Sequence, residues 1–360
     1  MHRPNAEIAI AGRRIGLDHP TYFIADIAAN HDGDIERAKA LIHLAAEAGA
    51  DVAKFQHFQA ETIVSDAGFR ALAPERMSHQ ANWKKSVFEI YKGASVDPDW
   101  TPILKETCDR AGIVFFTTPY ATDLVDKVDR YVPAYKIGSG DITWPDYIGY
   151  VAGKAKPLIL ASGAATMDDV VRAVDACLAV NPDTILLQCN TNYTGSLDNF
   201  RHVQLNVLNA YRAMYPGMIL GLSDHTPGHA AVLGAVALGG RVIEKHFTDD
   251  NARDGPDHKF ALNPKAWRDM VERTRELELA LGNAIKRIED NERDTVIIQR
   301  RGLRAARALA AGSVVGRDDV VALRPCPADG LAPYRLGEIV GRRLRRALGQ
   351  GEHLRVEDFE

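Results

Sequence analysis

Two histidines, His225 and His246, are placed as the ligands of one metal ion would be. Each stands at the end of a short apolar run typical of a β-strand, and the segment between the runs, 228–238, has the composition of a helix. Parallel strands joined by a right-handed helical crossover lie side by side, so both imidazoles would emerge at the same edge of the sheet. One such histidine more often caps its strand by bonding a loop carbonyl, but a matched pair on consecutive strands favours a metal site.

Polar residues also follow or end the other predicted strands, which makes one edge of the sheet rich in charge and hydroxyl groups. They are Asp26, Lys54, Gln56, Thr118, Lys136, Ser139, Asp141, Ser162, Thr191, Tyr193, Ser223, Glu244 and Lys245. Three lysines and several hydroxyls around one rim predict a phosphorylated, anionic substrate, because ammonium groups and short donors neutralise and orient phosphate oxygens. A single lysine could be a solvated rim charge, but Lys54 and Lys136 lie inside apolar runs, where a buried ammonium needs an anionic partner.

Eight short apolar runs supply the strands that would position these residues. They are 22–28, 51–56, 112–117, 134–138, 157–161, 184–189, 218–222 and 241–245. Most are continuously hydrophobic, as strands covered on both faces must be, and helical patterns lie between them. Eight strand–helix units predict an α/β fold, the (β/α)8 TIM barrel, with its chemistry at the carboxyl ends of the strands. An open doubly wound sheet is the alternative, but its usual GxGxxG turn is missing after the first run.

The composition excludes several classes of partner. The chain has 360 residues and a net charge of −4 from 44 basic and 48 acidic side chains, so neither nucleic acid nor a membrane is predicted as a partner. Its four cysteines are widely spaced without a CxxC pair, which is typical of reduced thiols in a cytoplasmic protein. Neither a signal peptide nor an uninterrupted run of about 18 apolar residues occurs, so we expect a soluble protein that acts on a small molecule.

Other segments lie outside the regular units. Residues 7–16 predict a small hairpin that plugs the bottom of the barrel. Asparagine and aspartate caps are expected before the helices that start at 264 and 35 respectively.

The long connection 60–97 predicts either a lid or a plain surface insertion, with Trp83, Lys84, Lys85, Phe88 and Tyr91 indicating a partly ordered helix. We expect a barrel domain over 1–282, a charged linker over 283–300 and a small β-rich domain over 301–360.

Eight motifs occur in order along the chain: FIADIAANHDG, VAKFQ, FFTTP, YKIGSGD, LASG, GLSDHTPG, IEKHFTDDNARDGPDH and ALRPCPADGLAP. Together they resemble the sialic acid synthase family, which includes N-acetylneuraminate, legionaminate and pseudaminate synthases, and they span nearly the whole sequence. The resemblance implies a C-terminal antifreeze-like (SAF) domain. It also implies an enzyme that condenses phosphoenolpyruvate with an open-chain N-acylated hexose, such as N-acetylmannosamine, to a nine-carbon 2-keto acid and phosphate by carbon–oxygen cleavage.

The resemblance also assigns roles to individual residues. It implies that His225 and His246 bind a divalent metal, with Mn²⁺ favoured and Mg²⁺ or Co²⁺ as alternatives. Contacts to the phosphate and carboxylate of the enolpyruvate fall on Lys54, Thr118, Lys136, Ser139, Ser162 and Ser223. The catalytic roles fall on Asp26, Asp141, Lys54 and Lys136, with Asp141 where the family handles water or a proton. The remaining substrate contacts fall on Gln56, Thr191, Tyr193, Asp257 and Arg324, with Arg324 reaching the sugar across a domain-swapped homodimer.

The sequence departs from the family in three places. Asp26 stands where many members have glutamate, and Asp141 ends the GSG motif where some have glutamate. The sixth strand continues as CNTNYTGS rather than in a Thr-Asn-x-Tyr pattern, which leaves the sugar's identity open. Two other functions remain as alternatives. A metal-dependent barrel hydrolase or aldolase acting on a phosphorylated sugar would also use two histidines, although a hydrolase normally needs a third or fourth protein ligand. A non-enzymatic ice- or carbohydrate-binding tail is the weakest alternative.

Overall fold

The structure is a computed structural model that describes residues 2–72, 80, 83 and 85–360. The chain divides into two compact units, Met1–Gly282 and Asn283–Glu360. Of the residues that indicated a helix in the 60–97 connection, Lys84 lies outside the described residues. Phe88 and Tyr91 lie in α4 (Val87–Ala94), which follows two shorter helices, α2 (Ala60–Ile63) and α3 (Asp66–Ala71).

Eight parallel strands form the wall of the first unit. They are β3 (Tyr22–Asp26), β4 (Val52–His57), β5 (Val114–Pro119), β6 (Tyr135–Ile137), β7 (Leu158–Ala161), β8 (Thr184–Cys189), β9 (Ile219–Asp224) and β10 (Val242–His246). Their hydrogen-bonded order is β5-β4-β3-β10-β9-β8-β7-β6, and the two end strands, β5 and β6, also lie next to each other. The sheet is therefore a nearly closed barrel, which confirms the predicted (β/α)8 architecture and excludes the open doubly wound sheet.

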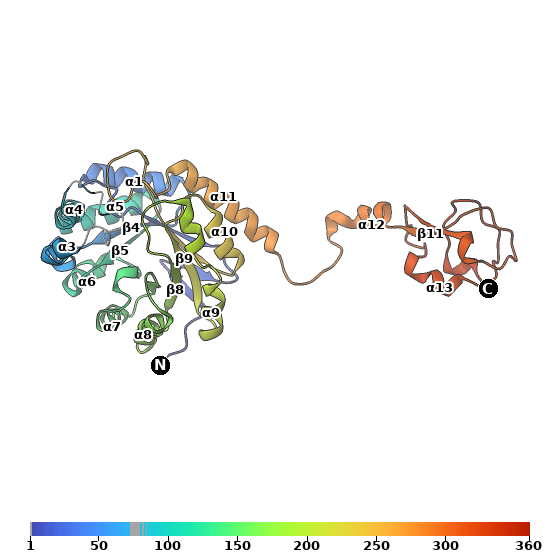
Figure 1. Cartoon of the computed structure of the whole chain (residues 1–360), viewed down its shortest axis with the longest axis horizontal. Coiled ribbons are helices and arrows are strands. Elements are labelled where there is room, and N and C mark those ends of the chain that lie inside the picture. The colour runs from blue at the N-terminus through green and yellow to red at the C-terminus, as the bar shows by residue number, and fades with distance from the viewer. Residues whose placement is uncertain (1, 73–79, 81–82, 84) are drawn as a thin grey trace. The chain divides into compact units, whose positions relative to one another are not determined.

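Helices surround this barrel on its outer face (Figure 1). They are α1 (Ile35–Glu47), α5 (Thr101–Ala111), α6 (Thr122–Val128), α7 (Pro145–Ala152), α8 (Met167–Leu178), α9 (Val207–Met214), α10 (Ala230–Ala237) and α11 (Pro264–Leu281). The expected caps are present: the Asp34 carboxylate accepts from the amides of Glu36 and Arg37 at the start of α1. Asn263 accepts from the amide of Ala266 at the start of α11, where Pro264 takes the position that has no intrahelical partner for its nitrogen.

Strand alternation decides which side chains enter the barrel. Successive residues of a strand face opposite sides of the sheet. In β3, Tyr22 and Ile24 belong to the core cluster inside the barrel, whereas Phe23 and Ala25 belong to the cluster between strands and helices. The next inner position, at the carboxyl end of β3, is Asp26, so the interior changes from apolar to polar along the strand.

The N-terminal hairpin closes the opposite end of the barrel. Strand β1 (Glu7–Ile10) pairs antiparallel with β2 (Arg13–Gly16). Its side chains Ile8, Ile10 and Ile15 are buried in the inner cluster, beside residues such as Tyr22 and Val242 that begin the barrel strands. The hairpin is thus an apolar plug at the amino-terminal end, as the sequence predicted.

The second unit has a core of its own. Strand β11 (Gly302–Ala305) pairs antiparallel with β12 (Val320–Leu323), and isolated bridges join further short segments. Its core is built from Leu303, Ala305, Leu309, Val315, Leu331, Ile339, Leu344, Leu348, Leu354 and Phe359. Between the barrel and β11 the chain forms the short helix α12 (Arg293–Gln299).

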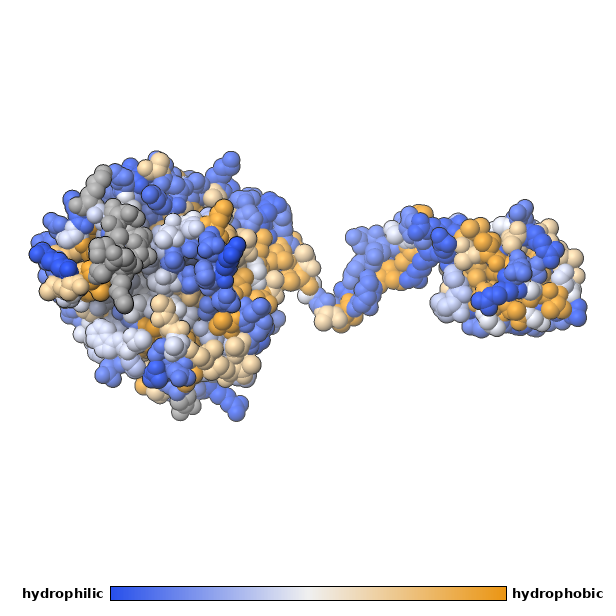
Figure 2. Space-filling view, viewed as in Figure 1, coloured by the Kyte–Doolittle hydropathy of each residue, from blue (hydrophilic) through white to orange (hydrophobic). Residues whose placement is uncertain are grey.

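On the visible surface of each unit, hydrophobic patches are interspersed among hydrophilic residues (Figure 2). Within the described part of the chain, each helix is too short or too polar to cross a bilayer.

Lys245 does not contribute to the interior, which corrects the expectation of three lysines around one rim. It pairs in register with Ala25 on one side and Asp224 on the other, both at outward-facing positions. Its ammonium lies 2.5 Å from the Asp224 carboxylate and donates to the carbonyl of Thr226 at 2.6 Å. Because both charged side chains are 1% exposed, this is a buried structural ion pair between barrel and helices.

We expect Lys245→Ala to lower the free energy of unfolding by about 3–5 kcal/mol, because it leaves the Asp224 carboxylate buried without its cation. Urea denaturation measures the loss. Lys105→Ala is the matched control, since its partner Asp109 lies one turn along α5 and is largely exposed, and such pairs contribute little. Similar small losses in both variants would contradict the structural role of the Lys245 pair.

Candidate active site

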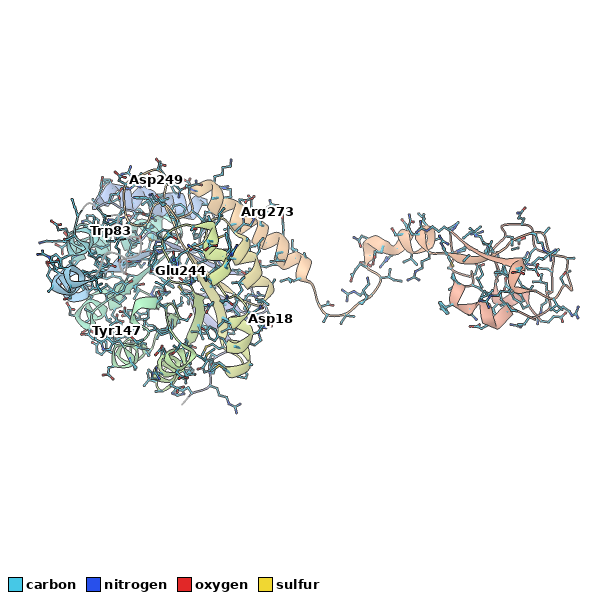
Figure 3. All side chains as sticks on the ribbon, in the orientation of Figure 1. Asp18, Trp83, Tyr147, Glu244, Asp249 and Arg273 are labelled. Carbon is cyan, nitrogen blue, oxygen red and sulfur yellow. The ribbon has the colours of Figure 1, made fainter. Side chains whose placement is uncertain are left out.

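A cavity of about 420 Å³ opens at the carboxyl ends of the barrel strands. Nearly all the candidate residues line it: Asp26, Lys54, Gln56, Thr118, Lys136, Ser139, Asp141, Thr191, Tyr193, Ser223, His225, His246 and Asp257. Glu244 lines it too and lies near the middle of the ring of strands in Figure 3, whereas Asp249 lies at the edge. The fold therefore brings residues from distant parts of the sequence into one chamber.

Lys54 is the centre of a buried charge cluster. Its Nζ lies 2.6 Å from Asp26 Oδ2, 3.4 Å from Thr118 Oγ1 and 3.9 Å from Glu244 Oε2. The same Asp26 oxygen accepts from Gln56 Nε2 at 3.1 Å. Burial alone would lower the pKa of Lys54, but the Asp26 and Glu244 carboxylates outweigh it and raise the pKa. The lysine is therefore a cation held in place by carboxylates of the protein itself.

Lys136 forms a second such cluster with Glu244. Its Nζ lies 3.4 Å from Glu244 Oε1 and donates to the carbonyl of Ile137 at 2.9 Å. Glu244 Oε1 also accepts from the Ser223 hydroxyl at 3.1 Å, whereas its Oε2 is buried without a hydrogen-bond partner among the described residues. The sequence placed Glu244 on the polar edge without giving it a role in the site, and its position two residues before His246 on β10 puts it on the same inner face. That spacing was the signal for it.

The two histidines face each other across β9 and β10. Their ring centroids are 5.4 Å apart. The Nδ1 of His225 is bonded to the carbonyl of Asn190 at 2.9 Å, so its Nε2 is the nitrogen left for a ligand. This is the capping bond considered from the sequence, and it is compatible with metal binding because such a bond orients a metal-binding imidazole.

His246 is surrounded by carboxylates. Its Nε2 lies 3.6 Å from Asp26 Oδ2, and its buried Nδ1, which has no hydrogen bond to the described residues, lies 3.7 Å from Asp257 Oδ2. Burial and the neighbouring His225 hold the pKa of His246 well below its usual value, so the ring is neutral. Tyr193 and Phe260 pack against the pair, with ring centroids 4.6 Å from His225 and 4.8 Å from His246 respectively.

The donor set suits an open metal site rather than a closed protein cage. In the ranges that the structure describes, no group of three or more His, Cys, Asp or Glu side chains is arranged to hold a metal ion. Two imidazoles, one with a fixed tautomer and one with an orphaned buried nitrogen, fit an ion whose remaining positions are filled by substrate oxygens or water.

Two further carboxyl groups in the cavity have unusual acidity. Burial raises the pKa of Asp141 to about 6, with Lys136 opposing the shift, and Asp141 Oδ2 has no hydrogen bond to any described residue. Burial also raises the pKa of Asp257 to about 6, although the amide of Ala29 donates to it at 3.3 Å. Asp141 is therefore a carboxyl group that changes its proton easily near neutral pH and has an oxygen free for a ligand.

The loop that carries Asp257 is fastened to the loop after β3. Asp32 accepts from His258 Nε2 at 3.0 Å and from Arg253 at 2.8 Å. The fully buried His258 also bonds Thr248 Oγ1 at 2.7 Å. These contacts fix the residue next to Asp257, so Asp257 is held against the cavity by polar bonds rather than by apolar packing.

Small residues shape the hydroxyl-bearing side. The hydroxyls of Ser139 and Thr191 lie 2.8 Å apart. Gly163 between them has a φ of +59°, and a Cβ there would lie 2.3 Å from the Cβ of Ser139. A glycine is thus required for Ser139 and Thr191 to meet.

Two predicted site residues are not among those that line the cavity. Ser162 lies between Ala161 and Gly163, which face the inside of the barrel, so its side chain faces outward. Its hydroxyl donates to Gln188 Oε1 at 3.1 Å and accepts from the amide of Cys189 at 3.1 Å, which ties β7 to β8. Arg324 lies in the second unit, directly after β12.

One side of the cavity was not among the predicted site residues. Phe58, Ile63, Ile90, Tyr91, Ala94 and Tyr120 line it. All but Tyr120 come from the end of β4 and the connection that follows, for which the sequence left open a lid or a surface insertion and indicated a partly ordered helix that includes Tyr91. This connection is therefore not a plain surface insertion.

The chain matches the NeuB family over residues 41–286 and the SAF domain over residues 300–360. It is 32% identical over 351 residues to the N,N'-diacetyllegionaminic acid synthase of Legionella pneumophila, with 96% of each chain covered. It is 33% identical over 280 residues to the human N-acetylneuraminate-9-phosphate synthase, with 77% of this chain and 76% of the human one covered.

Solved structures agree with this match. The crystal structure of an N-acetylneuraminic acid synthetase from Leptospira borgpetersenii has a TM-score of 0.70 and 27% identity, and covers 82% of this chain and 97% of its own. The barrel fold is thus shared with a solved sialic acid synthetase. The chain belongs to the NeuB family.

The raised pKa of Asp141 predicts a pH-dependent effect of Asp141→Asn. A carboxyl whose pKa rises from 3.8 to about 6 on folding favours the folded state at low pH, and this contribution is lost as the pH rises through 6. Between pH 4.5 and pH 7.5 the wild type should therefore lose about 2 kcal/mol of unfolding free energy through Asp141, and the variant should not. The stability difference, variant minus wild type, should rise by this amount. Denaturation at both pH values measures this; a difference that does not change with pH would contradict it.

Proposed function

We propose that this protein is a nonulosonic acid synthase that condenses phosphoenolpyruvate with the open aldehyde form of an N-acylated hexose. The products are a nine-carbon 2-keto acid and phosphate. The observation that carries the proposal is the composition of one cavity, in which buried lysines with nearby hydroxyls lie beside two facing histidines. Relatives named as legionaminic, pseudaminic and N-acetylneuraminate-type synthases support the same activity.

The lysine side of the cavity is assigned to phosphoenolpyruvate. Lys54 and Lys136 offer two fixed ammonium groups, and the hydroxyls of Thr118, Ser139 and Ser223 lie beside them in the same lining. Such preorganised donors bind phosphate and carboxylate oxygens strongly because the site is sheltered from water. Ser162 is left out of this set, since its hydroxyl is already bonded within the sheet.

The histidine side is assigned to the sugar aldehyde. A divalent ion held by His225 and His246, Mn²⁺ or alternatively Mg²⁺ or Co²⁺, would supply Lewis-acid polarisation of the aldehyde. Tyr193, which lines the cavity and packs against His225, would then border the carbons next to the aldehyde, while the buried Phe260 supports His246.

The chemistry needs one carbon–carbon bond, one water molecule and one broken carbon–oxygen bond. The methylene carbon of phosphoenolpyruvate bonds to the aldehyde carbon, and the positive charge that develops at the phosphate-bearing carbon is stabilised by the Asp141 carboxylate. Water adds to that carbon and gives one proton through Asp141 to the new alkoxide. The bond to the phosphate oxygen then breaks, the second water proton leaves with phosphate, and the 2-keto acid remains.

The deciding experiment measures phosphate release. We expect release only when phosphoenolpyruvate, an N-acylated hexose and a divalent metal are all present, and reversible loss of activity on chelation. His225→Ala and His246→Ala should each lower kcat by about a thousandfold or more, because the aldehyde loses its electrophilic activation. His229→Ala is the control, since His229 is partly exposed and pairs with Asp269 outside the cavity. Phosphate release from a sugar phosphate without phosphoenolpyruvate would instead favour the hydrolase or aldolase alternative.

We also propose that the protein is a homodimer in which the SAF unit of one subunit covers the barrel of the other. Two observations support this: Arg324 matches a sugar-contacting position in the family resemblance, and it lies in the second compact unit, Asn283–Glu360, which begins with a charged segment. A two-fold dimer would then exclude water from an otherwise open barrel mouth.

Mixed dimers test this arrangement. His246→Ala and Arg324→Ala should each be inactive or weak alone, and equal mixing with subunit exchange should restore about a quarter of wild-type activity, because one barrel of each heterodimer then has both groups intact. If the Arg324 unit serves its own barrel, every site keeps one lesion and mixing restores nothing.

A further inference from the structure

The two facing histidines are not held by the same part of the main chain. His246 is the last residue of β10 and pairs in register with Asp26 of β3. His225 comes one residue after the end of β9, and the register between β9 and β10 ends at the pair of Asp224 with Lys245. Strand pairing therefore fixes His246 but stops short of His225.

A cluster of buried side chains begins where this ladder ends. The Nζ of Lys245 lies 2.5 Å from Asp224 Oδ2 and donates to the carbonyl of Thr226 at 2.6 Å, so one lysine reaches the residues on both sides of His225. Asp224 Oδ1 also accepts from the amide and the hydroxyl of Thr226, at 2.9 Å and 2.8 Å, which closes the turn around His225. We call Asp224, Thr226 and Lys245 the brace.

The brace joins the neighbours of both histidines. Asp224 and Thr226 flank His225 in the sequence, and Lys245 directly precedes His246. All three members of the brace are buried, so water does not compete for their bonds, and none of them lines the cavity. Stability alone does not explain a charged cluster here, because well-packed apolar side chains of similar size stabilise a fold at least as well as a buried ion pair.

We propose that the brace positions the metal site: it ties the His225 turn to β10, so that both imidazoles reach one divalent ion. This inference rests on the metal site of the proposed function. The bond from His225 Nδ1 to the Asn190 carbonyl orients the ring, whereas the brace places the main chain that carries it, with the two ring centroids 5.4 Å apart. Asp224, Thr226 and Lys245 are thus positioning residues that act through the histidines, and such outer partners change metal affinity by about tenfold to a hundredfold.

A pair of variants separates positioning from stability. Lys245→Met alone leaves the Asp224 carboxylate buried without its cation and should lower both stability and metal affinity. The double variant Asp224→Asn/Lys245→Met leaves no unpaired charge and keeps an acceptor for Thr226, so its urea midpoint should return most of the way to that of the wild type. The link to β10 is still missing, and its Kd for Mn²⁺ should therefore stay about tenfold or more above the wild-type value. Electron paramagnetic resonance of free Mn²⁺ measures binding to the full-length, metal-stripped proteins without any substrate.

Two controls complete the experiment. Leu160→Ala lowers stability through a cavity in the core on β7, which is separated from β9 by β8, and it leaves the brace intact. Its Kd for Mn²⁺ should stay within about twofold of the wild-type value, since outer partners of the metal site are unchanged. His246→Ala should abolish the binding, which assigns the measured ion to the two histidines.

The outcomes separate this inference from the function on which it rests. If the double variant recovers stability and Mn²⁺ affinity together, or if Leu160→Ala weakens binding as much as the double variant does, the brace acts through folding alone and the inference is wrong. If the wild type binds no Mn²⁺ that depends on His246, the metal site and the inference both fail. If binding depends on the brace but phosphoenolpyruvate and an N-acylated hexose release no phosphate, the inference stands and the proposed reaction is wrong.

Discussion

The pairing of two buried lysines with buried carboxylates underlies the whole candidate site. Lys54 and Lys136 are each 2% exposed, and an isolated ammonium at such a place would lose its charge or destabilise the fold. Asp26 and Glu244 prevent this, at distances of 2.6 Å and 3.4 Å. The barrel supplies both partners from inner positions of different strands, so the charges exist only because the sheet closes. The pair of buried cations is therefore a property of the closed barrel and not of any one segment.

Much of this arrangement could be predicted, and strand alternation explains both the successes and the errors. The apolar runs located all eight strands, and their carboxyl ends located most of the cavity. Lys245 and Ser162 were misplaced because a residue at a strand end was treated as an inner residue without counting positions from the apolar core. One step along a strand turns a side chain from the cavity to the helices. The same count, applied from His246, separates Glu244, which lines the cavity, from Lys245, which does not.

The side of the cavity that Ile63, Ile90 and Ala94 line could not be predicted in this way. Its residues come from short helices in a long connection, and their position depends on contacts that are distant in sequence, such as Tyr91 on Phe58 and Gly93 on Gly33. Periodicity predicts a helix but not the surface on which it packs. Arg324 poses a different problem. Its motif indicates a role in the site of the barrel, but the residue itself lies in the second unit, Asn283–Glu360. For the residues of this connection and for Arg324, the family resemblance indicated the type of reaction but not which sugar is used.

The charge of the cavity gives a physical reason for a divalent ion beyond the presence of two histidines. Among the described lining residues, the two lysines face four carboxyl groups, those of Asp26, Asp141, Glu244 and Asp257. With all of them ionised, the chamber is more negative than positive and would repel a phosphorylated carboxylate such as phosphoenolpyruvate. A divalent cation at the histidines would offset this excess, since His246 lies beside two of the carboxylates. On this argument the proposed ion would prepare the cavity for the proposed anionic substrate before acting on the aldehyde, and the carboxylates that hold the lysines in place would be the reason for needing it.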